Sequence, residues 1–366
     1  MTWNRERPYN ELPALPPDLT ALETTRVLKA VTEARVQLAR LDQATDLMPD
    51  PTVLINTIPL LEAQASSEIE NIVTTADALF KAAQVRDGQV DPAVKETLRY
   101  RTALRFGFES MTRRTLTART AAEVCSHIRG IATDVRTLPG TRIANPAAGD
   151  IIYSPPEGAE VIHHMLANWE RFIHARDGLD PIVKMATAHY QFEAIHPFSD
   201  GNGRTGRIIN MLILNSWGLL RLPILYLSRY VIEHKNDYYS LLDGVTAHQE
   251  WEAWNLYMIE AVRQSAESTT RKVLAIRDLQ ADFHARFETA AKGMSNIDFL
   301  RVLFSQPYSR IGDVTDACHV TRQTASSWLD ALAREGALVK IKAGRDRLFL
   351  NQEYLDLLVR REDVPA

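Results

Sequence analysis

A short run in the middle of the chain holds side chains that could move a phosphate group. It reads His-Pro-Phe-Ser-Asp-Gly-Asn-Gly-Arg-Thr-Gly-Arg, from His196 to Arg207. An imidazole can accept a hydroxyl proton near neutral pH, which typically contributes ~10²–10⁴ to a rate. Asp200 is suited to Mg²⁺, which usually takes one or two carboxylates together with phosphate oxygens. Pro197 predicts that the preceding helix ends at His196.

The rest of the run is suited to holding phosphates. Gly201 and Gly203 can both take positive φ angles, which would turn neighbouring N–H groups into one anion-binding concavity. A buried helix predicted from Arg204 would add its positive N-terminal end. Arg204 and Arg207 are three residues apart, so both can grip phosphates from one helix face, and Asn202 can donate to a phosphate oxygen. The run therefore predicts phosphoryl or nucleotidyl transfer to a hydroxyl.

Two other phosphate-binding motifs fit this run less well. Residues 201–206 match the dinucleotide-binding pattern G-x-G-x-x-G, but the preceding stretch is predicted to be helical rather than a strand. Tyr226 also stands where that pattern expects an acidic residue. A Walker loop is excluded because no Gly-Lys-Ser/Thr follows at the required spacing.

The run resembles the Fic-domain motif His-x-Phe-x-Asp/Glu-Gly-Asn-Gly-Arg-x-x-Arg, with every specified position present. Members of that family transfer AMP from ATP to a Ser, Thr or Tyr hydroxyl of a protein and release pyrophosphate. The resemblance implies that His196 is the general base, Phe198 anchors the loop and Asp200 holds Mg²⁺. It also implies a set of groups that bind the ATP phosphates, of which Arg207 reaches the γ-phosphate: Gly201, Asn202, Gly203, Arg204 and Arg207. The residues alone do not distinguish attack at the α-phosphate from attack at the γ-phosphate.

A second stretch, Ser66-Ser-Glu-Ile-Glu-Asn71, resembles the inhibitory motif Ser/Thr-x-x-x-Glu-Gly/Asn of the same family. By itself the stretch would be an ordinary amphipathic helix with solvated glutamates. Ser66 and Glu70 are four residues apart and would share a helix face. In relatives with this motif, the glutamate pairs with the second motif arginine and blocks the γ-phosphate site. The resemblance therefore implies an autoinhibitory pair of Glu70 with Arg207.

Between residues 140 and 156 the helical pattern breaks. Ile151, Ile152 and Tyr153, framed by Asn145-Pro146, Gly149 and Pro155-Pro156, predict a short hairpin. A loop with a purely structural role is an equally valid interpretation. The position is similar to that of the Fic flap, which holds the target segment through main-chain contacts.

Three tyrosines after the motif occupy a segment that in the family lies near the base of the nucleotide. Tyr230, Tyr238 and Tyr239 could stack on adenine. Aromatic residues at helical spacing more often belong to a core, so both interpretations stay open.

The C-terminal region resembles a winged helix. Residues 311–320 and 321–335 predict two helices, and the strands 338–342 and 347–350 flank a turn. Four residues of the second helix could hydrogen-bond to bases: Arg322, Gln323, Thr324 and Ser326. Four cations could contact phosphates: Lys340, Lys342, Arg345 and Arg347. Acidic and basic residues nearly balance in this region, so dimerisation or partner docking is as open as DNA binding.

The whole chain has 366 residues, 45% hydrophobic and 24% charged, which is ample for a packed core. We expect an all-α Fic-type helical bundle with a small β-hairpin flap and a C-terminal winged helix-turn-helix domain. The expected divisions are 1–110 with the inhibitory helix, 111–290 as the catalytic core and 295–366 as the winged helix. Residues 1–19 carry four prolines and predict an extended arm on the surface or on a partner.

The composition bears on the cellular compartment and on the classes of partner that the protein could bind. The net charge of −4 does not point to nucleic acid or to an anionic membrane. Cys125 and Cys318 are far apart, which fits a reducing cytoplasm and argues against a disulfide scaffold or a zinc site. We expect neither a signal peptide nor a membrane span.

The favoured function is that of an autoinhibited, cytoplasmic protein adenylyltransferase that uses ATP and Mg²⁺ on an unidentified protein target, itself or another protein. The rival is a DNA-binding regulator whose core senses nucleotide. A homodimer, and removal of AMP at the same site, also stay open.

Overall fold

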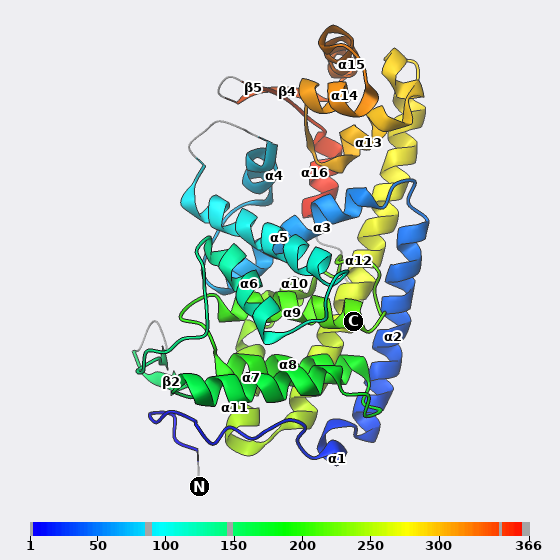
Figure 1. Cartoon of the computed structure of the whole chain (residues 1–366). Coiled ribbons are helices and arrows are strands. Elements are labelled where there is room, and N and C mark those ends of the chain that lie inside the picture. Colours follow the sequence, from blue (N-terminus) through cyan, green and yellow to red (C-terminus); the bar gives the residue numbers. More distant parts are fainter. Residues whose placement is uncertain (1–2, 85–89, 145–148, 344–345, 361–366) are drawn as a thin grey trace. The chain divides into compact units, whose positions relative to one another are not determined.

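The computed structural model describes residues 3–84, 90–144, 149–343 and 346–360, and most of them are helical (Figure 1). The chain forms two compact units. The first contains residues 1–39, 99–223 and 227–265, and the second contains residues 40–98, 224–226 and 266–366. The mostly helical fold with one small hairpin and a small C-terminal sheet confirms the predicted fold class.

The first unit is built around helix α8 (Pro181–Ile195), which packs against α7 (Ala159–His174) and α9 (Asn202–Ser216) (Figure 1). Every residue of α8 except Glu193 is buried. A helix that is buried on all sides belongs in a core, so α8 is the central helix of this unit. Its other helices are α1 (Leu19–Leu22), α6 (Ala118–Arg129), α10 (Leu227–Glu233) and α11 (Lys235–His248).

Local signals in the sequence set both ends of α8. Asp180 caps its start by accepting a hydrogen bond from the Ile182 amide at 2.8 Å, and Pro181 is the first helical residue. The helix ends at His196, which takes a left-handed conformation with φ +49° before Pro197. The sequence therefore predicted correctly which residue α8 presents at its C-terminal end.

Three long helices pass through both units. They are α2 (Thr25–Asp46), α5 (Pro92–Ser110) and α12 (Trp251–Phe287). Among the described residues, no helix combines the length and the hydropathy that crossing a bilayer requires.

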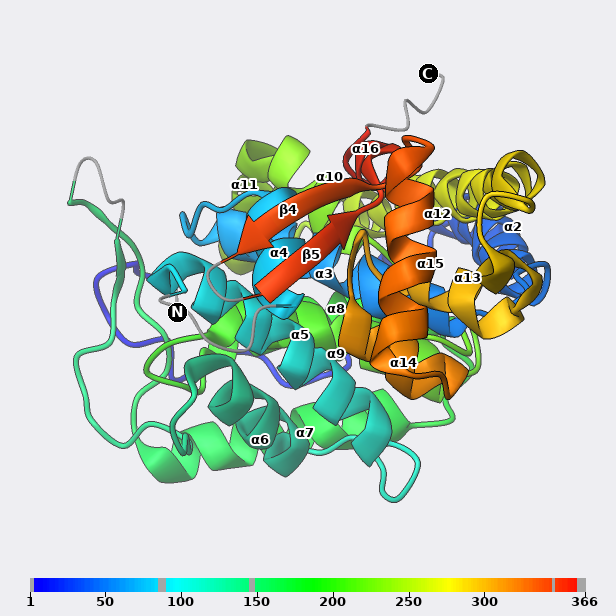
Figure 2. The ribbon, with the colours of Figure 1, turned by 90° about the horizontal axis from the view of Figure 1, so that it is seen from above.

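The second unit contains the C-terminal helices and a three-stranded antiparallel sheet in the order β3-β5-β4. Its strands are β3 (Tyr308–Arg310), β4 (Val339–Ala343) and β5 (Asp346–Leu350). Its helices are α3 (Thr52–Ile69), α4 (Ala76–Gln84), α13 (Ile297–Ser305), α14 (Ile311–Cys318), α15 (Arg322–Arg334) and α16 (Gln352–Val359), with a 3₁₀ turn at Lys292–Ser295. Figure 2 shows the β4–β5 hairpin beside α15, as in a winged helix. The sequence did not predict the third strand, β3.

The segment that carries the inhibitory motif packs on the C-terminal domain. Helix α3 contacts α13, and α4 contacts β3. Arg301 of α13 forms an ion pair with Asp50 at 2.7 Å, and the Tyr308 hydroxyl of β3 donates to Asp77 of α4 at 2.5 Å. Helices α3 and α4 and the C-terminal domain therefore belong to one compact unit.

The predicted N-terminal arm lies on the surface of the first unit. Leu12 and Leu15 are buried there. The Asn168 side chain of α7 accepts from the Leu15 amide at 2.7 Å and donates to its carbonyl at 2.9 Å. Gln191 of α8 donates to the Pro13 carbonyl at 2.9 Å. Side-chain amides of two core helices thus fix the arm through its main chain.

Candidate active site

His196 stands at the junction of α8 and the following loop, where the main chain turns sharply. A positive φ is unusual for a residue other than glycine, so other contacts must hold this conformation. The His196 amide donates to the Phe192 carbonyl at 3.0 Å, and the His196 carbonyl accepts from Arg136 Nε at 2.8 Å. The main chain of His196 is therefore fixed on both sides, while the residue stays partly exposed.

Phe198 and Asn202 give the loop after His196 its shape. The Phe198 ring is buried and meets Phe192 edge to face, with ring centroids 6.1 Å apart. Asn202 accepts from the Phe198 amide and donates to the Phe198 carbonyl, both at 2.8 Å. The Asn202 side chain, which we expected to contact phosphate, therefore closes the loop in this structure. Phe198 lies in the core, where the resemblance placed it.

Only one of the two motif glycines takes a positive φ. Gly201 has φ +84° and precedes the first residue of α9. A Cβ at Gly201 would also lie 3.3 Å from Cys125 Sγ. The expectation that Gly203 turns the chain in the same way is wrong, because α9 already begins at Asn202 and Gly203 belongs to its first turn. The amides directed at a ligand therefore come from a helix N-terminus rather than from a two-glycine nest.

Positive charge gathers at this end of α9. Arg204 and Arg207 are both buried, at 3% exposure each. Arg129 of α6 adds a third guanidinium, whose Nη1 donates to Ser199 at 3.1 Å and whose Nε lies 3.7 Å from Asp200. An incoming anion would meet these charges together with the positive end of the helix dipole. Nothing in the local sequence pattern singled out Arg129.

Asp200 is the carboxylate that the motif predicts as a ligand of a metal ion. Its side chain is 63% exposed, and Arg204 Nη2 lies 3.9 Å from its Oδ1. In the described part of the chain, no cluster of three or more His, Cys, Asp and Glu side chains could enclose a metal by itself. Mg²⁺ usually keeps several waters and binds one or two carboxylates plus substrate phosphates, so a single exposed aspartate beside an anion site fits it.

Arg136 is a further residue of the site that the sequence reasoning missed. Its guanidinium donates to the carbonyls of His196 (2.8 Å), Pro156 (2.5 Å) and Ile195 (3.3 Å). Its own amide donates to the Pro197 carbonyl at 2.8 Å. Burial lowers the pKa of Arg136 from its ordinary value, with the Glu157 charge acting in the opposite direction. One buried arginine thus joins the end of α8, the catalytic loop and the residues after the flap.

A second missed residue, His189, lies inside the bundle. It is buried, its Nε2 lies 2.8 Å from the Tyr238 hydroxyl, and its ring stacks on Trp254. Burial and, to a smaller extent, the charge of Arg207 lower the pKa of His189 to about 3. A Cβ at Gly206 would lie 3.2 Å from the His189 ring, so this glycine lets α9 pass close to α8. His189 is therefore neutral at working pH and belongs to the packing behind the anion site.

The tyrosines after the motif form an aromatic cluster with Trp254 and Tyr257. Tyr238 is buried in this cluster, where it meets His189. Tyr230 stacks on His234 at 4.1 Å, and Tyr239 meets Tyr238 edge to face and is 46% exposed. Tyr238 therefore packs in the core. Stacking on adenine stays a prediction for all three tyrosines.

The predicted hairpin consists of β1 (Ile143–Ala144) and β2 (Ile151–Tyr153), which pair antiparallel. Ile151 is partly exposed and Ile152 is 41% exposed, whereas Tyr153 is buried and donates through its hydroxyl to the Ala194 carbonyl at 2.9 Å. Burial raises the pKa of Tyr153 well above its ordinary value. The strand is therefore tied to the last turn of α8, next to His196. Asn145 and Pro146, which framed the prediction, lie outside the described residues.

The N-terminal arm reaches this hairpin. Ser154, directly after β2, donates through its hydroxyl to the Arg5 carbonyl at 2.6 Å, and its own carbonyl accepts from the Tyr9 amide at 3.0 Å. Arg142 donates to the Glu6 carbonyl at 2.9 Å. The arm thus braces both sides of the flap through main-chain groups.

The inhibitory motif marks the end of α3. Ser66 is a buried residue of the helix, and Glu70 is its exposed C-cap. Asn71 has φ +63°, a conformation that asparagine and glycine tolerate best, which explains why the motif ends in one of them. Glu70 belongs to the second unit and Arg207 to the first, so their pairing stays a prediction.

Comparison with known protein families gives three matches along the chain. The model for the Fic/DOC family N-terminal region matches residues 28–109, and that for the Fic/DOC family matches residues 116–214. A third model, the C-terminal domain of SoFic-like protein adenylyltransferases, matches residues 282–354.

The chain is also similar to curated proteins over part of its length. Protein adenylyltransferase fic-1 of Caenorhabditis elegans is 41% identical over 64 residues, which is 18% of this chain and 11% of that protein. Protein adenylyltransferase fic-1 of Caenorhabditis briggsae is 34% identical over 89 residues, 24% of this chain and 16% of that protein. A probable protein adenylyltransferase of Aquifex aeolicus is 34% identical over 79 residues, 22% of this chain and 24% of that protein. The matched segment spans less than a quarter of each relative.

Solved structures support the fold over a longer range. A Fic family protein from Desulfovibrio desulfuricans G20 has a TM-score of 0.56 at 19% identity, covering 90% of this chain and 96% of that one. A Fic domain containing signaling protein from Bacteroides thetaiotaomicron has a TM-score of 0.51 at 18% identity, covering 65% of this chain and 97% of that one. With the complete motif, this fold and the family matches, the chain belongs to the Fic/DOC family and carries Fic N-terminal and SoFic-like C-terminal domains.

Proposed function

We propose that the protein transfers AMP from ATP to a Ser, Thr or Tyr hydroxyl of a protein. The observation that carries this proposal is the junction of α8 and α9. There, His196 is fixed through its main chain directly before a helix N-terminus with two buried arginines, Arg204 and Arg207. A proton acceptor thus adjoins a positively charged site suited to phosphates, as nucleotidyl transfer to a hydroxyl requires.

The reaction follows from these positions. The target hydroxyl gives its proton to His196 while its oxygen forms a bond to the α-phosphorus of ATP. The bond between that phosphorus and the bridging oxygen of the β-phosphate breaks, and pyrophosphate leaves. Arg204, Arg207 and the first amides of α9 hold the phosphates and stabilise the charge that develops on them. Asp200 would hold Mg²⁺, which would neutralise phosphate charge when bound.

In this proposal the flap binds the second substrate, which is a segment of the target protein. Ile151 and Ile152 are accessible to a target segment, while Tyr153 keeps the strand attached to α8 one turn or less from His196. Main-chain pairing with a short strand selects for an extended segment rather than for one side chain. Target specificity would then depend on the fit of that segment.

We further propose that Glu70 inhibits the enzyme by occupying the place of the γ-phosphate on Arg207. A carboxylate there would neutralise the arginine and repel the triphosphate. The position of Glu70, an exposed residue at the C-terminal end of α3 that directly precedes the left-handed Asn71, supports this proposal. Removal of the carboxyl should therefore increase productive ATP binding.

Labelling with radioactive ATP and Mg²⁺, alone and in a cell lysate, tests both proposals. The variant Glu70→Ala should incorporate one adenylyl group per modified hydroxyl at least ~10-fold faster than the unchanged protein, since a lost charge pair is worth more than ~1.4 kcal/mol. Glu68→Ala, which removes another exposed carboxyl of the same segment, should leave the rate unchanged. His196→Ala in the Glu70→Ala background should abolish labelling.

The outcomes separate the two proposals. If Glu70→Ala and Glu68→Ala label equally fast and His196→Ala is inactive, the enzyme is a transferase without this inhibition. If the Glu70→Ala protein binds ATP but transfers no adenylyl group to itself or to any lysate protein, the transferase proposal is wrong.

A further inference from the structure

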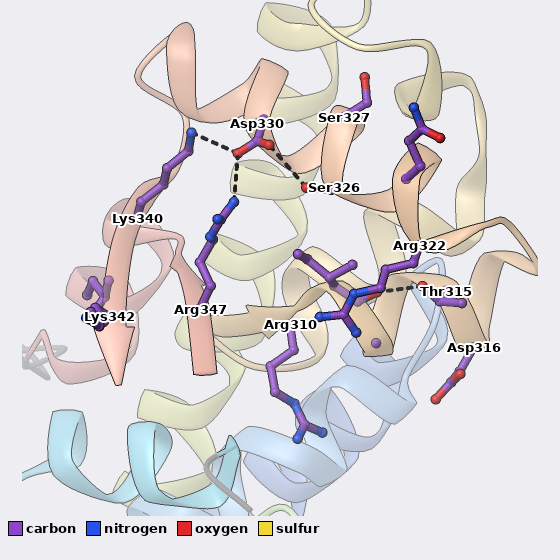
Figure 3. Close-up of a pocket in the computed structure, with 14 residues that line it drawn as sticks. Arg310, Thr315, Asp316, Arg322, Ser326, Ser327, Asp330, Lys340, Lys342 and Arg347 are labelled. Carbon is purple, nitrogen blue, oxygen red and sulfur yellow. Dashed lines mark hydrogen bonds and ion pairs between the residues drawn. The ribbon is translucent and has the colours of Figure 1, made fainter. Parts of the chain in front are cut away.

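A groove in the second unit lies on the winged-helix domain and has a volume of about 1450 Å³ (Figure 3). Residues of β3, α14, α15 and the β4–β5 hairpin line it. Five basic side chains from four elements line it: Arg310, Arg322, Lys340, Lys342 and Arg347. Two acidic side chains, Asp316 and Asp330, also line it, which leaves an excess of three positive charges. The groove is therefore basic even though the whole chain carries a net charge of −4.

Ion pairs connect the two walls of this groove, helix α15 and the β4–β5 hairpin. Asp330 of α15 forms an ion pair with Lys340 of β4 at 2.8 Å, lies 3.9 Å from Arg347 of β5 and accepts from Ser326 at 3.1 Å (Figure 3). Burial alone would raise the pKa of Asp330, but these hydrogen bonds and charges outweigh it and keep the pKa below its ordinary value. Asp330 thus stays ionised and braces the wing against the helix, so the cations need little rearrangement to meet a ligand.

The wing itself carries a like-charge pair. Lys342 and Arg347 are direct cross-strand partners in the β4–β5 hairpin. Side chains of cross-strand partners lie on one face of a sheet, and like charges placed there destabilise the pair. Lys340 stands two residues before Lys342 and so shares that face. Asp330 offsets part of this repulsion through Lys340 and Arg347, and a bound anion would offset more of it.

The helix wall presents groups that can recognise bases. Arg322, Gln323 and Ser326 line the groove from the first two turns of α15. Thr321 caps this helix by accepting from the Thr324 amide at 3.2 Å, so its N-terminal end is preformed. Arginine and glutamine at the exposed start of a helix can form paired hydrogen bonds with purine edges in a major groove.

We propose that this groove binds duplex DNA, with α15 in the major groove and the β4–β5 wing on the phosphate backbone. The arrangement of charges separates DNA from other polyanions. The cations flank a helix with exposed polar side chains, and the major groove of B-form DNA admits a helix, whereas that of A-form RNA is too narrow. Arg345 lies outside the described residues and has no part in this inference. The site is independent of AMP transfer.

The test measures the affinity of the full-length chain for fluorescent duplexes by anisotropy at two salt concentrations. If Arg322, Lys340, Lys342 and Arg347 each neutralise one phosphate, the logarithm of affinity falls with that of salt with a slope of about −3.6. Between 50 and 200 mM salt this corresponds to a loss of about 150-fold. The double variant Arg322→Ala/Lys342→Ala should have a slope near −1.8 and lose only about 12-fold.

Controls make the result specific to the groove. Arg334→Ala removes an exposed cation from the other end of α15, outside the groove, and should leave the slope unchanged. His196→Ala should bind DNA like the unchanged protein, so failed transfer would not affect this test. An unchanged slope in the folded double variant would overturn the proposal. Equal affinity for duplex RNA, or binding only to a protein partner, would also overturn it.

Discussion

Replacement of Arg136 by methionine should lower kcat strongly while leaving the binding of ATP nearly unchanged. Methionine keeps much of the buried volume but loses all three guanidinium hydrogen bonds, of which those to His196 and Pro156 are short, at 2.8 and 2.5 Å. Each hydrogen bond from a charged donor typically contributes about 1.5–3 kcal/mol, so the two bonds represent about 3–6 kcal/mol. The Arg136 amide bond to Pro197 would survive the change.

Part of this loss would appear as displacement of the catalytic loop. The left-handed conformation of His196 costs about 1–2 kcal/mol, and Arg136 binds the carbonyl that this conformation exposes. Once that bond is lost, the loop can relax. A displacement of about 1 Å in a reacting group can reduce a rate by about 10². We therefore expect kcat for self-modification, or for a labelled lysate target, to fall by about 10²-fold.

The assay measures labelling rate against ATP concentration in the Glu70→Ala background. Arg204 and Arg207 are unchanged in Arg136→Met, so KM for ATP should change less than about threefold while kcat carries the loss. Arg136→Lys keeps a charged donor and should recover part of kcat. Arg142→Met removes an exposed arginine that donates to the arm, at the Glu6 carbonyl, and serves as the matched control.

Two results would refute this reasoning. One is a folded Arg136→Met protein with unchanged kcat. The other is a loss confined to KM for ATP, because a change in ATP binding alone would place the role of Arg136 in the anion site rather than in the orientation of His196.

Three further predictions concern the metal, the core and the flap. Asp200→Asn should raise the Mg²⁺ concentration needed for half-maximal rate at least ~10-fold, and calorimetry should show ATP binding retained without metal; an unchanged Mg²⁺ requirement would exclude Asp200 as the ligand. The pKa of about 3 for His189 lies below its ordinary value near 6.5. As pH falls from about 6.5 towards 3, His189 therefore becomes protonated in the unfolded chain but stays neutral in the folded one. The stability that neutral His189 contributes is lost over that pH range. Urea unfolding from pH 7 to 5 should show a dependence on pH that is shallower by up to about 1.4 kcal/mol per unit in His189→Asn, but not in the exposed control His163→Asn. A chain that begins at residue 11 loses the two hydrogen bonds between the arm and Ser154, so it should show a higher KM for the protein target at constant KM for ATP; equal values for the target would show that the arm does not order the flap.

The sequence by itself determined the elements whose signals are local. Asp180-Pro181 and Pro197 set the two ends of α8 and so placed His196, because a cap and a missing amide act within one helical turn. The hairpin at Ile151–Tyr153 and the helix pair with its wing followed in the same way from turn residues and periodicity. The motif from His196 to Arg207 was sufficient to predict the family.

Only the tertiary structure decided which groups surround that motif. Arg136 bonds to a carbonyl 60 residues away, and Arg129 to a side chain 70 residues away, and no periodic pattern links such positions. Asn202 turned inward to Phe198, and Gly203 became helical, because closing the loop satisfied main-chain groups that a free loop would leave unpaired. A local hydrogen bond depends on neighbours in sequence, whereas the partner of a buried arginine depends on how helices pack. The sequence therefore determined the residues of the motif, and the packing of the helices determined which other groups hold the motif in place.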